Sequence, residues 1–372
     1  MLSYWEKSSL IEYDLVVVGG GLVGSFAALT YRKHHPKARI ALLERGILPS
    51  GASTKNAGFA CFGSISELQE DLNDCNLDEL VALTEKRFKG IEYLRANLSD
   101  TSIGYEAVKG YELVFKTVDS DQLAFFNDAL STVFGKNPFS DQTASLNAYP
   151  FGSKVKGLIE HAFEGTVHTG MLMKTLHQKL QEEGISCFTG SELVEFEETS
   201  SGVSLWVASS KQKLQFKSQQ LVFCTNAFTQ HFFPELDITP GRGLVVVTHP
   251  IENFRLSGSF HYHSGYNYFR CIDNRILLGG ARHLDKSSET TTDFGINEKI
   301  LNQLIEDLHT IIAPDYKLEV DYSWSGIMAF GKNKQPIIRK MSDRVAVAAR
   351  LGGMGVALGS LVGKEVVELL DL

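Results

Sequence analysis

The chain lacks the features that mark membrane-spanning or exported proteins. It contains no run of about 18 consecutive apolar residues, so no transmembrane helix is predicted. Its first ten residues contain no basic segment followed by an apolar core, which argues against a secretory signal. The first predicted strand then begins too early to leave room for a transit peptide. We therefore expect a cytoplasmic protein.

An excess of positive charge is also absent. Lysine and arginine together number 36 against 44 aspartate and glutamate residues, which gives a formal net charge of −8. Attraction between basic side chains and phosphates supplies much of the affinity of nucleic-acid-binding proteins. The charge balance therefore argues against a nucleic-acid partner and favours small-molecule partners.

Cysteines and linkers are few. The five cysteines are scattered, odd in number and form no C-x-x-C pair, which predicts free thiols in a reducing compartment and no metal site. No internal repeat, low-complexity tract or Pro/Ser-rich linker divides the 372 residues. A chain of this length is expected to form more than one domain, so we predict two domains that exchange segments along the chain.

The most informative segment lies near the N-terminus. Residues 15–18 form an apolar run rich in β-branched side chains, followed by Gly19, Gly21 and Gly24 with the spacing G-x-G-x-x-G. The first glycine permits a tight turn, the second permits close approach of a pyrophosphate, and the third permits close packing of helix on strand. This arrangement is typical of the first βα unit of a dinucleotide-binding fold.

The residues that follow complete this unit. Residues 22–31 predict a helix whose first amides and positive dipole end would face the phosphates. A second strand is predicted over residues 40–43, and it ends at Glu44, where a carboxylate can accept hydrogen bonds from ribose hydroxyls. The strand, the helix and the acid together predict a dinucleotide ligand.

A second glycine cluster lies near the C-terminus. Gly352, Gly353 and Gly355 follow a predicted strand at 345–349 and precede a predicted helix at 356–370. Two helix N-termini that a ligand can approach, one near each end of the chain, suit a long ligand with two polar regions. FAD fits this description, because its pyrophosphate and its flavin C2 carbonyl both favour such sites.

The pattern of predicted strands indicates an α/β (α+β) fold. Strand-like runs between residues 185 and 227 return to an apolar strand of the parallel type, whereas residues 240–328 alternate polar and aromatic side chains as an antiparallel sheet does. We predict an FAD-binding Rossmann-like domain with a parallel sheet, interleaved with a substrate domain built on a mainly antiparallel sheet. The predicted FAD-binding domain comprises residues 1–85, 150–238 and 329–372, and the predicted substrate domain comprises residues 86–149 and 239–328.

The chain resembles the D-amino-acid oxidase-like family of FAD-dependent oxidoreductases, which includes glycine oxidase, sarcosine oxidase and γ-glutamylputrescine oxidase. Five segments carry the resemblance and follow in the family's order along nearly the whole chain. They are the glycine fingerprint with Glu44, the loop 51–58 (GASTKNAG), the segment 221–227 with 240–243 after it, Trp324-Ser-Gly326 leading to Pro336, and the glycine-rich run 352–363.

The resemblance implies a noncovalently bound FAD and a set of cofactor contacts. The first glycines would hold the pyrophosphate, the loop 51–58 would wrap the pyrophosphate and the flavin edge, and the C-terminal glycines would meet the ribityl chain and the flavin O2 region. The implied cofactor-binding residues are Gly19, Gly21, Leu22, Val23, Gly24, Glu44, Arg45, Ser53, Thr54, Lys55, Asn56, Ala57, Gly58, Val194, Thr225, Asn226, Ala227, Gly352, Gly353, Met354, Gly355 and Val356.

The sequence departs from the family at two positions that concern substrate and oxygen. Met328 stands where glycine oxidase-like members place an arginine for the substrate carboxylate, and Leu277 stands where sarcosine oxidase-like members place a lysine over the flavin. The cysteine that tethers flavin in some members is also absent. Specificity for α-amino acids and the use of O2 rather than another electron acceptor therefore stay open.

Candidate catalytic residues come from the predicted second sheet. Alternation along residues 261–270 places Tyr268 and Arg270 on one face, and we expect one of them to contact substrate. Arg242 is a second candidate partner for a carboxylate or for the flavin, and Lys332 and Arg350 are weaker ones.

The expected reaction is oxidation of a C–N bond of a small amine or amino acid by hydride transfer to flavin N5, followed by hydrolysis of the imine in water. An FAD-dependent 2-hydroxy-acid dehydrogenase of the same fold is an alternative, and His263 could serve as its base. A tRNA-modifying flavoenzyme module and a flavin-binding protein without turnover are further alternatives.

Overall fold

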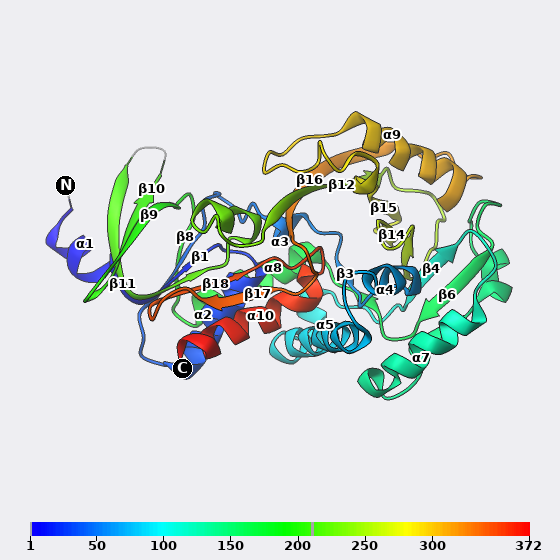
Figure 1. Cartoon of the computed structure of the whole chain (residues 1–372). Coiled ribbons are helices and arrows are strands. Elements are labelled where there is room, and N and C mark those ends of the chain that lie inside the picture. Colours follow the sequence, from blue (N-terminus) through cyan, green and yellow to red (C-terminus); the bar gives the residue numbers. More distant parts are fainter. Residues whose placement is uncertain (1, 210–211) are drawn as a thin grey trace.

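The computed structural model describes residues 2–209 and 212–372. Two eight-stranded sheets lie side by side, one on the left and one on the right in Figure 1. Helices α5 (Leu77–Asn97) and α10 (Gly355–Leu370) pack against each other between them. Within the described residues, no helix combines the length and apolar composition needed to cross a membrane.

The first sheet contains the predicted nucleotide-binding strands. Its order is β17-β18-β11-β1-β2-β8, with neighbours parallel from β18 to β8 and β17 antiparallel at the edge. The hairpin β9–β10 extends from β11. The strands are β1 (Glu12–Val18), β2 (Ile40–Leu43), β8 (Ser186–Phe188), β9 (Glu192–Thr199), β10 (Gly202–Ala208), β11 (Lys213–Phe223), β17 (Ile337–Lys340) and β18 (Val345–Ala349).

The second sheet is antiparallel apart from one pair. Its order is β16-β12-β15-β14-β13-β4-β6-β5, and the pair β13–β4 is parallel. The strands are β4 (Gly110–Val114), β5 (Phe139–Asp141), β6 (Gly157–His161), β12 (Thr239–Thr248), β13 (Ser259–Tyr262), β14 (Asn267–Ile272), β15 (Arg275–Gly280) and β16 (Val320–Phe330). A two-stranded ribbon, β3 (Phe59–Ala60) with β7 (Gly165–Thr166), is separate from both sheets.

The helices pack on and between these sheets. Helix α2 follows the first glycines as predicted, and its buried face contacts α10. The α-helices other than α5 and α10 are α1 (Tyr4–Ser9), α2 (Leu22–His34), α3 (Ala52–Lys55), α4 (Ile65–Asp71), α6 (Asp100–Ile103), α7 (Ser120–Phe134), α8 (Thr169–Glu182) and α9 (Glu298–Asp307). Helix α9 continues as a π-helical turn to Ile312.

The predicted mixed fold with one largely parallel and one mainly antiparallel sheet is confirmed. One strand lies elsewhere than the predicted division of the chain implies. Strand β6 falls in the segment from residue 150 onward, which we assigned to the FAD-binding domain, but it pairs with β4 in the second sheet. The predicted boundaries at 85/86 and 328/329 also fall inside α5 and β16. The division into two domains itself stays a prediction.

Candidate active site

A cleft of about 1430 Å³ is lined by residues of both sheets. All but three of the predicted cofactor residues line it. Gly24 lies behind the cleft, where a Cβ atom would lie 2.0 Å from the Gly19 carbonyl oxygen, so this glycine allows helix α2 to pack on strand β1. Thr54 donates its hydroxyl to the Pro49 carbonyl, and Gly58 (φ 77°) packs on the Val167 carbonyl. These three residues shape the walls from outside the cleft.

Three helix N-termini at the cleft differ from the others. Seven α-helices in the described ranges begin with a side chain that accepts an amide hydrogen of the first turn, whereas α2, α3 and α10 have no such side-chain cap. The first residues of α2 and α10 line the cleft. Long helices that begin without a cap beside a cavity provide the positive dipole end that a phosphate or a carbonyl oxygen favours. The two positions match the two polar regions of FAD.

Glu44 occupies the position expected for the ribose ligand. Its Oε2 accepts the amide of Gly20 at 3.1 Å, and its Oε1 accepts the amide of Gly46 at 2.8 Å and the hydroxyl of Ser50 at 3.2 Å. A carboxylate offers about four lone-pair sites, so Glu44 can accept a further hydrogen bond from a ligand. The side chain is 7 % exposed and lines the cleft. Its orientation is therefore fixed by the backbone turns on either side.

The adenosine end of the cleft has a flat wall. The guanidinium carbon of Arg45 lies 3.8 Å from the centre of the Phe228 ring, and both residues line the cleft. Val194, Thr225, Asn226 and Ala227 line the same region. A stacked cation and ring form a planar surface, which suits the predicted placement of adenine.

The C-terminal glycine turn leaves space on the cleft side. Gly353 has a φ of 85°, and the nearest atom to a Cβ built on it is Met328 Sδ at 3.8 Å. The left-handed backbone favours glycine, and the open space admits a ligand to the first turn of α10. Ser53 reaches across to the other helix, where its Oγ accepts the Leu22 amide at 2.9 Å. The cleft therefore fits the predicted FAD at both ends.

The second sheet supplies the wall that faces this turn. Tyr268, His261, Gly243, Val245 and Met328 line the cleft there. Burial raises the pKa of Tyr268 to about 12, so the phenol is neutral at physiological pH. Its hydroxyl makes no hydrogen bond within the described ranges and is free to meet a ligand.

The other three predicted catalytic residues do not line the cleft. His263 packs on the rings of Phe115 and His283. Arg270 is buried, and its Nη1 donates to the carbonyls of Gly58 and Val167 at 3.0 and 2.9 Å.

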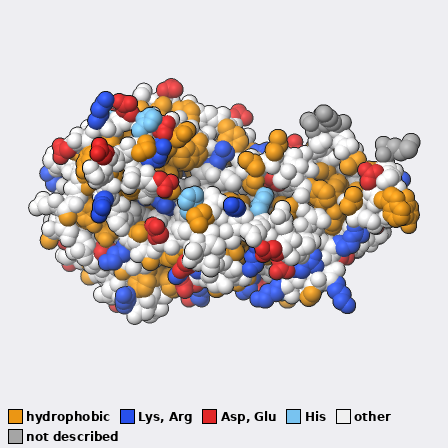
Figure 2. Space-filling model, turned by 180° about the vertical axis from the view of Figure 1, so that it is seen from behind, with side chains coloured by type: hydrophobic (Ala, Val, Ile, Leu, Met, Phe, Trp, Pro, Cys, Tyr) orange, Lys and Arg blue, Asp and Glu red, His pale blue; other side chains and the backbone are white. Residues whose placement is uncertain are grey.

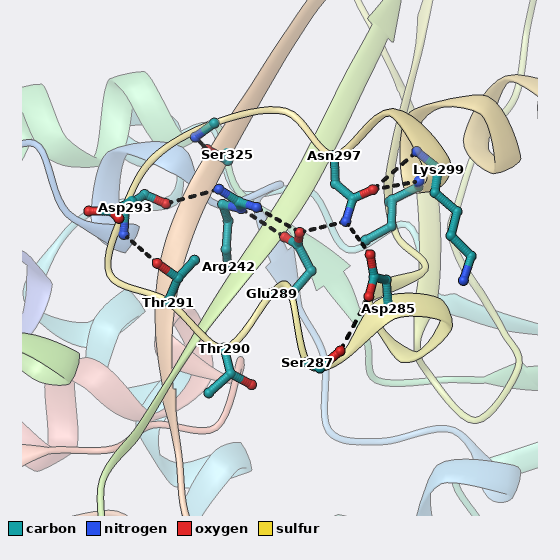
Figure 3. A network of polar contacts seen from close by, with 12 residues as sticks. Arg242, Asp285, Ser287, Glu289, Thr290, Thr291, Asp293, Asn297, Lys299 and Ser325 are labelled. Carbon is teal, nitrogen blue, oxygen red and sulfur yellow. Dashed lines mark hydrogen bonds and ion pairs between the residues drawn. The ribbon is translucent and has the colours of Figure 1, made fainter.

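Arg242 forms an ion pair with Glu289 and donates to the Asp293 carbonyl, as Figure 3 shows. Arg242 and Arg270 therefore both bind other residues of the chain and stabilise the fold around the cleft. The weaker candidates also divide: Lys332 lines the cleft, whereas Arg350 pairs with Asp237 outside it.

The structure adds a charged chamber that sequence reasoning missed. Gly90 of α5 packs on the first turns of α10, and the cleft continues past that point along the N-terminal half of α5. Arg87 and Glu67 line this chamber and are 1 % and 7 % exposed. The amine of Lys334 pairs with Glu67 at 2.8 Å and with Asp71 at 2.6 Å. Charge of both signs is therefore available where the flavin would end.

Arg87 is the largest fully buried side chain of the described residues. Its Nη1 donates to the Phe62 carbonyl at 2.7 Å, and its Nε has no hydrogen-bond partner within the described chain. A buried guanidinium without a full set of acceptors is unusual, because each unpaired donor costs free energy. A ligand that accepts hydrogen bonds would complete it.

A second charged group lies in the wall of the cleft. The Nε2 atom of His261 lies 3.3 Å from Oε2 of buried Glu164, and the potential ligand atoms of Cys61 and of this pair lie within 4.8 Å of one another. Because His261 and Glu164 pair with each other, we interpret the group as an ion pair beside a thiol and not as a metal centre. Burial raises the pKa of the Cys61 thiol well above its usual value, so this thiol is not the reactive kind.

Comparisons with known proteins agree with this site. Residues 14–369 match the family described as FAD dependent oxidoreductase (DAO). The chain is 24% identical over 370 residues to the probable oxidoreductase OrdL of Haemophilus influenzae, covering 96% of this chain and 82% of that protein.

Solved structures of the same fold cover nearly the whole chain. Glycine oxidase from Geobacillus kaustophilus superposes with a TM-score of 0.78 at 21% identity, over 97% of this chain and 95% of that one. L-proline dehydrogenase from P. horikoshii superposes with a TM-score of 0.75 at 16% identity, over 96% and 93%. The family match shows that the cofactor is FAD, and noncovalent binding is typical of this family. The chain belongs to the DAO family of FAD-dependent oxidoreductases.

Proposed function

We propose that this oxidoreductase oxidises a C–N bond of a small amine or amino acid. The observation that carries the proposal is the chamber at the end of the cofactor cleft, where His261 and Arg87 are buried and Tyr268 is half-buried, yet all three line the cavity. Bound FAD supplies the hydride acceptor. The chain's own residues hold the substrate carbon in position and keep bulk water away, so that the lone pair on the substrate nitrogen can assist loss of the hydride.

Each wall residue has a task in this proposal. The Tyr268 hydroxyl would donate to an acceptor on the substrate, because it is neutral and has no partner in the described chain. Arg87 would attract an anionic group, because its guanidinium is buried at the cleft wall and donates to one acceptor of the described chain, the Phe62 carbonyl. The names of glycine oxidase and L-proline dehydrogenase indicate amino-acid substrates for those two proteins, which supports the same substrate class here.

The test is anaerobic bleaching of the protein-bound flavin. Purified protein would be mixed, without oxygen, with glycine, sarcosine, D-alanine, L-proline, putrescine and lactate, and absorbance near 450 nm would be followed (about the maximum of oxidised flavin). Bleaching by an amine or amino acid is the expected result, and admitting air then distinguishes an oxidase from a dehydrogenase. Bleaching by lactate alone would establish the hydroxy-acid alternative instead. A flavin that no compound reduces would overturn the proposal.

The alternatives receive less support from the geometry. The hydroxy-acid reading relied on His263 as a base, and this residue packs on Phe115 away from the cleft. A tRNA-modifying role needs a basic surface, but the net charge is −8, and acidic and basic side chains are interspersed over the face drawn in Figure 2. We therefore propose small-molecule substrates with O2 or another electron acceptor.

A further inference from the structure

His261 and Glu164 form a buried pair at the wall of the substrate chamber. His261 lies on β13 and is 6 % exposed, and Glu164 lies in the turn between β6 and β7 and is 2 % exposed. Their Nε2 and Oε2 atoms lie 3.3 Å apart, within the distance of an ion pair, and neither atom has a hydrogen-bond partner among the described residues. The second oxygen of Glu164, Oε1, accepts the Phe62 amide at 2.9 Å. The carboxylate is therefore fixed by the backbone on one side and by the imidazole on the other.

The groups around the pair strengthen the affinity of the imidazole for a proton. Burial alone would lower the pKa of His261, but Glu164 outweighs it, with smaller contributions from Glu67 on α4 and Glu112 on β4, so the pKa is raised. Burial alone would raise the pKa of Glu164, and His261 again outweighs it, so that pKa is lowered.

Other titratable side chains lie near the pair. Glu67 is itself paired with Lys334. Burial raises the pKa of Glu112 and lowers the pKa of His161. The Cys61 thiol is also kept neutral by burial. Glu164 is therefore the carboxylate that lies directly against His261.

The geometry is that of a base oriented by a carboxylate. Glu164 faces Nε2, so Nδ1 is the imidazole nitrogen left for a ligand, and His261 lines the cleft. The ring of Phe59 lies 5.2 Å from the imidazole and 5.3 Å from the Tyr268 ring, so the three side chains form one continuous wall. A nitrogen base held by a buried acid is the arrangement that enzymes use to transfer protons at neutral pH.

We infer that His261, oriented by Glu164, accepts the ammonium proton of the amine substrate in this chamber. This rests on the proposed function. The N–H bond of the substrate breaks, the electron pair stays on nitrogen, and the proton moves to Nδ1 of the neutral imidazole. No oxidant takes part in this step. The neutral amine that results has the lone pair needed to assist loss of the hydride, which an ammonium ion lacks.

The first measurement follows the imidazole itself. The Cε1–H signals of the histidines in the flavin-loaded protein would be titrated by NMR, with His261→Gln to assign the signal. Loss of the facing carboxylate in Glu164→Gln is expected to lower the midpoint of this titration, whereas Glu164→Asp keeps the charge and should retain most of the shift. An unchanged midpoint in Glu164→Gln would contradict the claim that Glu164 raises the pKa of His261.

The second measurement follows catalysis. With the amine that bleaches the wild-type flavin fastest, kcat/KM is expected to rise with pH through the His261 pKa, and Glu164→Gln should move this limb to lower pH. His261→Gln should lower kcat at least about 100-fold with its flavin content unchanged, in the range typical of a lost proton acceptor. His177→Gln, on α8 and outside the cleft, is the matched control and should behave as wild type.

The proposed function and the role of His261 can be contradicted separately. If no amine bleaches the wild-type flavin, the proposed function is wrong and the proton-accepting role falls with it. If an amine does bleach it and His261→Gln keeps the wild-type rate and pH limb, the function stands and the role of His261 is wrong. Circular dichroism and flavin content show whether each variant is folded, and Glu164→Asp provides a folded partner should Glu164→Gln unfold.

Discussion

Arg242 and Glu289 form a two-point ion pair between strand β12 and the loop that follows β15. The Nε and Nη2 atoms of Arg242 lie 2.9 and 2.8 Å from the two carboxylate oxygens of Glu289 (Figure 3). Both side chains are largely buried, and Asn297 donates a further hydrogen bond to Glu289 at 2.9 Å. Asp293 and Phe294 of the same loop line the cleft. The pair therefore fixes a wall of the site from outside it.

We expect Arg242→Ala to destabilise the fold by about 3 kcal/mol, because it leaves the Glu289 carboxylate buried without its cation. Arg242→Lys keeps the positive charge but loses the two-point contact of the guanidinium, so its loss of stability should be smaller. Denaturant unfolding of the flavin-loaded proteins measures both. The double variant Arg242→Met with Glu289→Gln removes the stranded charge and should recover part of the stability. Equal stability of Arg242→Ala and wild type would show that the pair contributes nothing.

The cofactor site gives a second prediction, at Gly21. A Cβ atom there would lie 2.6 Å from Ser53 Oγ, in the space where a pyrophosphate would approach helix α2. Gly21→Ala should weaken FAD binding by at least about tenfold, or ~1.4 kcal/mol, while the apoprotein stays folded. The ratio of absorbance near about 450 nm to that near about 280 nm reports flavin content.

The double variant Gly21→Ala with Ser53→Ala separates two causes of that loss. It removes the contact within the protein but keeps the methyl group in the phosphate's path. Flavin content that stays low supports direct blocking of the phosphate. Full recovery would place the effect in the protein's own packing and contradict the proposed role of Gly21.

The sequence predicted the cofactor end of the site well, because that chemistry is local. The spacing of Gly19, Gly21 and Gly24 is a property of one turn between a strand and a helix, so it can be read without knowing the rest of the fold. Glu44 follows at the end of the next strand, and parallel neighbours bring the ends of β1 and β2 to one edge of the sheet. The structure gathers these residues as the pattern requires.

The substrate end could not be predicted in the same way. Alternation correctly placed Tyr268 and Arg270 on one face of β14, but it does not show which residue another segment covers. The carbonyls of Gly58 and Val167 lie over Arg270 and bind its guanidinium, whereas Tyr268 stays at the cavity.

Long-range pairing limits the prediction in the same way. Glu164 and His261 are 97 positions apart in the sequence, one in the turn between β6 and β7 and the other on β13. No local sequence pattern predicts that they pair. The pairing of strand β6 with β4 is likewise a long-range choice that the apolar composition of β6 does not encode.

The Lys334 cluster gives a prediction for pH. Burial would raise the pKa of Glu67, but Lys334 and Arg87 outweigh it, so the folded-state pKa is lowered. A lowered pKa adds stability that is present above the unfolded value and is lost as pH falls through the folded value. Lys334→Met removes a charge that lowers the pKa of both acids, so burial should then raise the pKa of Glu67 and should raise the pKa of Asp71 further.

The loss of stability in Lys334→Met should therefore be largest near neutral pH and should shrink as pH falls through the folded-state pKa values of Glu67 and Asp71, where both acids take up protons. Unfolding midpoints across that range measure it. Lys332→Met is the matched control, because Lys332 is exposed and its side chain makes no ion pair within the described ranges. A loss that is independent of pH would show that Lys334 acts through packing and not through charge.

Tyr268→Phe tests the wall of the chamber. The variant removes a hydroxyl that is neutral and unpaired in the described chain, so the fold and the flavin should be unaffected. We expect KM for the bleaching substrate to rise several-fold, by about 1 kcal/mol of lost hydrogen bonding, with a smaller change in kcat. Steady-state kinetics measure the two separately. A lower flavin content with unchanged KM would place Tyr268 at the cofactor and not at the substrate.

A last prediction concerns the contact between α5 and α10. It compares Gly90, which lies in this contact, with Gly359, which lies between α10 and α2. A Cβ atom at Gly90 would lie 1.9 Å from the Ala357 carbonyl oxygen, which is backbone, whereas one at Gly359 would lie 2.4 Å from Cδ2 of Leu22, the end of a flexible side chain. Alanine favours a helix over glycine by about 1 kcal/mol, so each substitution would stabilise its helix if space allowed.

Gly90→Ala must move the first turns of α10 away from α5, at a cost of about 2–3 kcal/mol, and those turns line the cofactor cleft. Gly359→Ala needs only a new rotamer of Leu22, so its effect should stay within about 1 kcal/mol. Thermal unfolding, followed together with release of flavin fluorescence, compares them: Gly90→Ala should lose flavin at a lower temperature than Gly359→Ala. If both variants release flavin at the wild-type temperature, the close approach of α5 does not position the N-terminus of α10, and the flavin end of the cleft is held by other contacts.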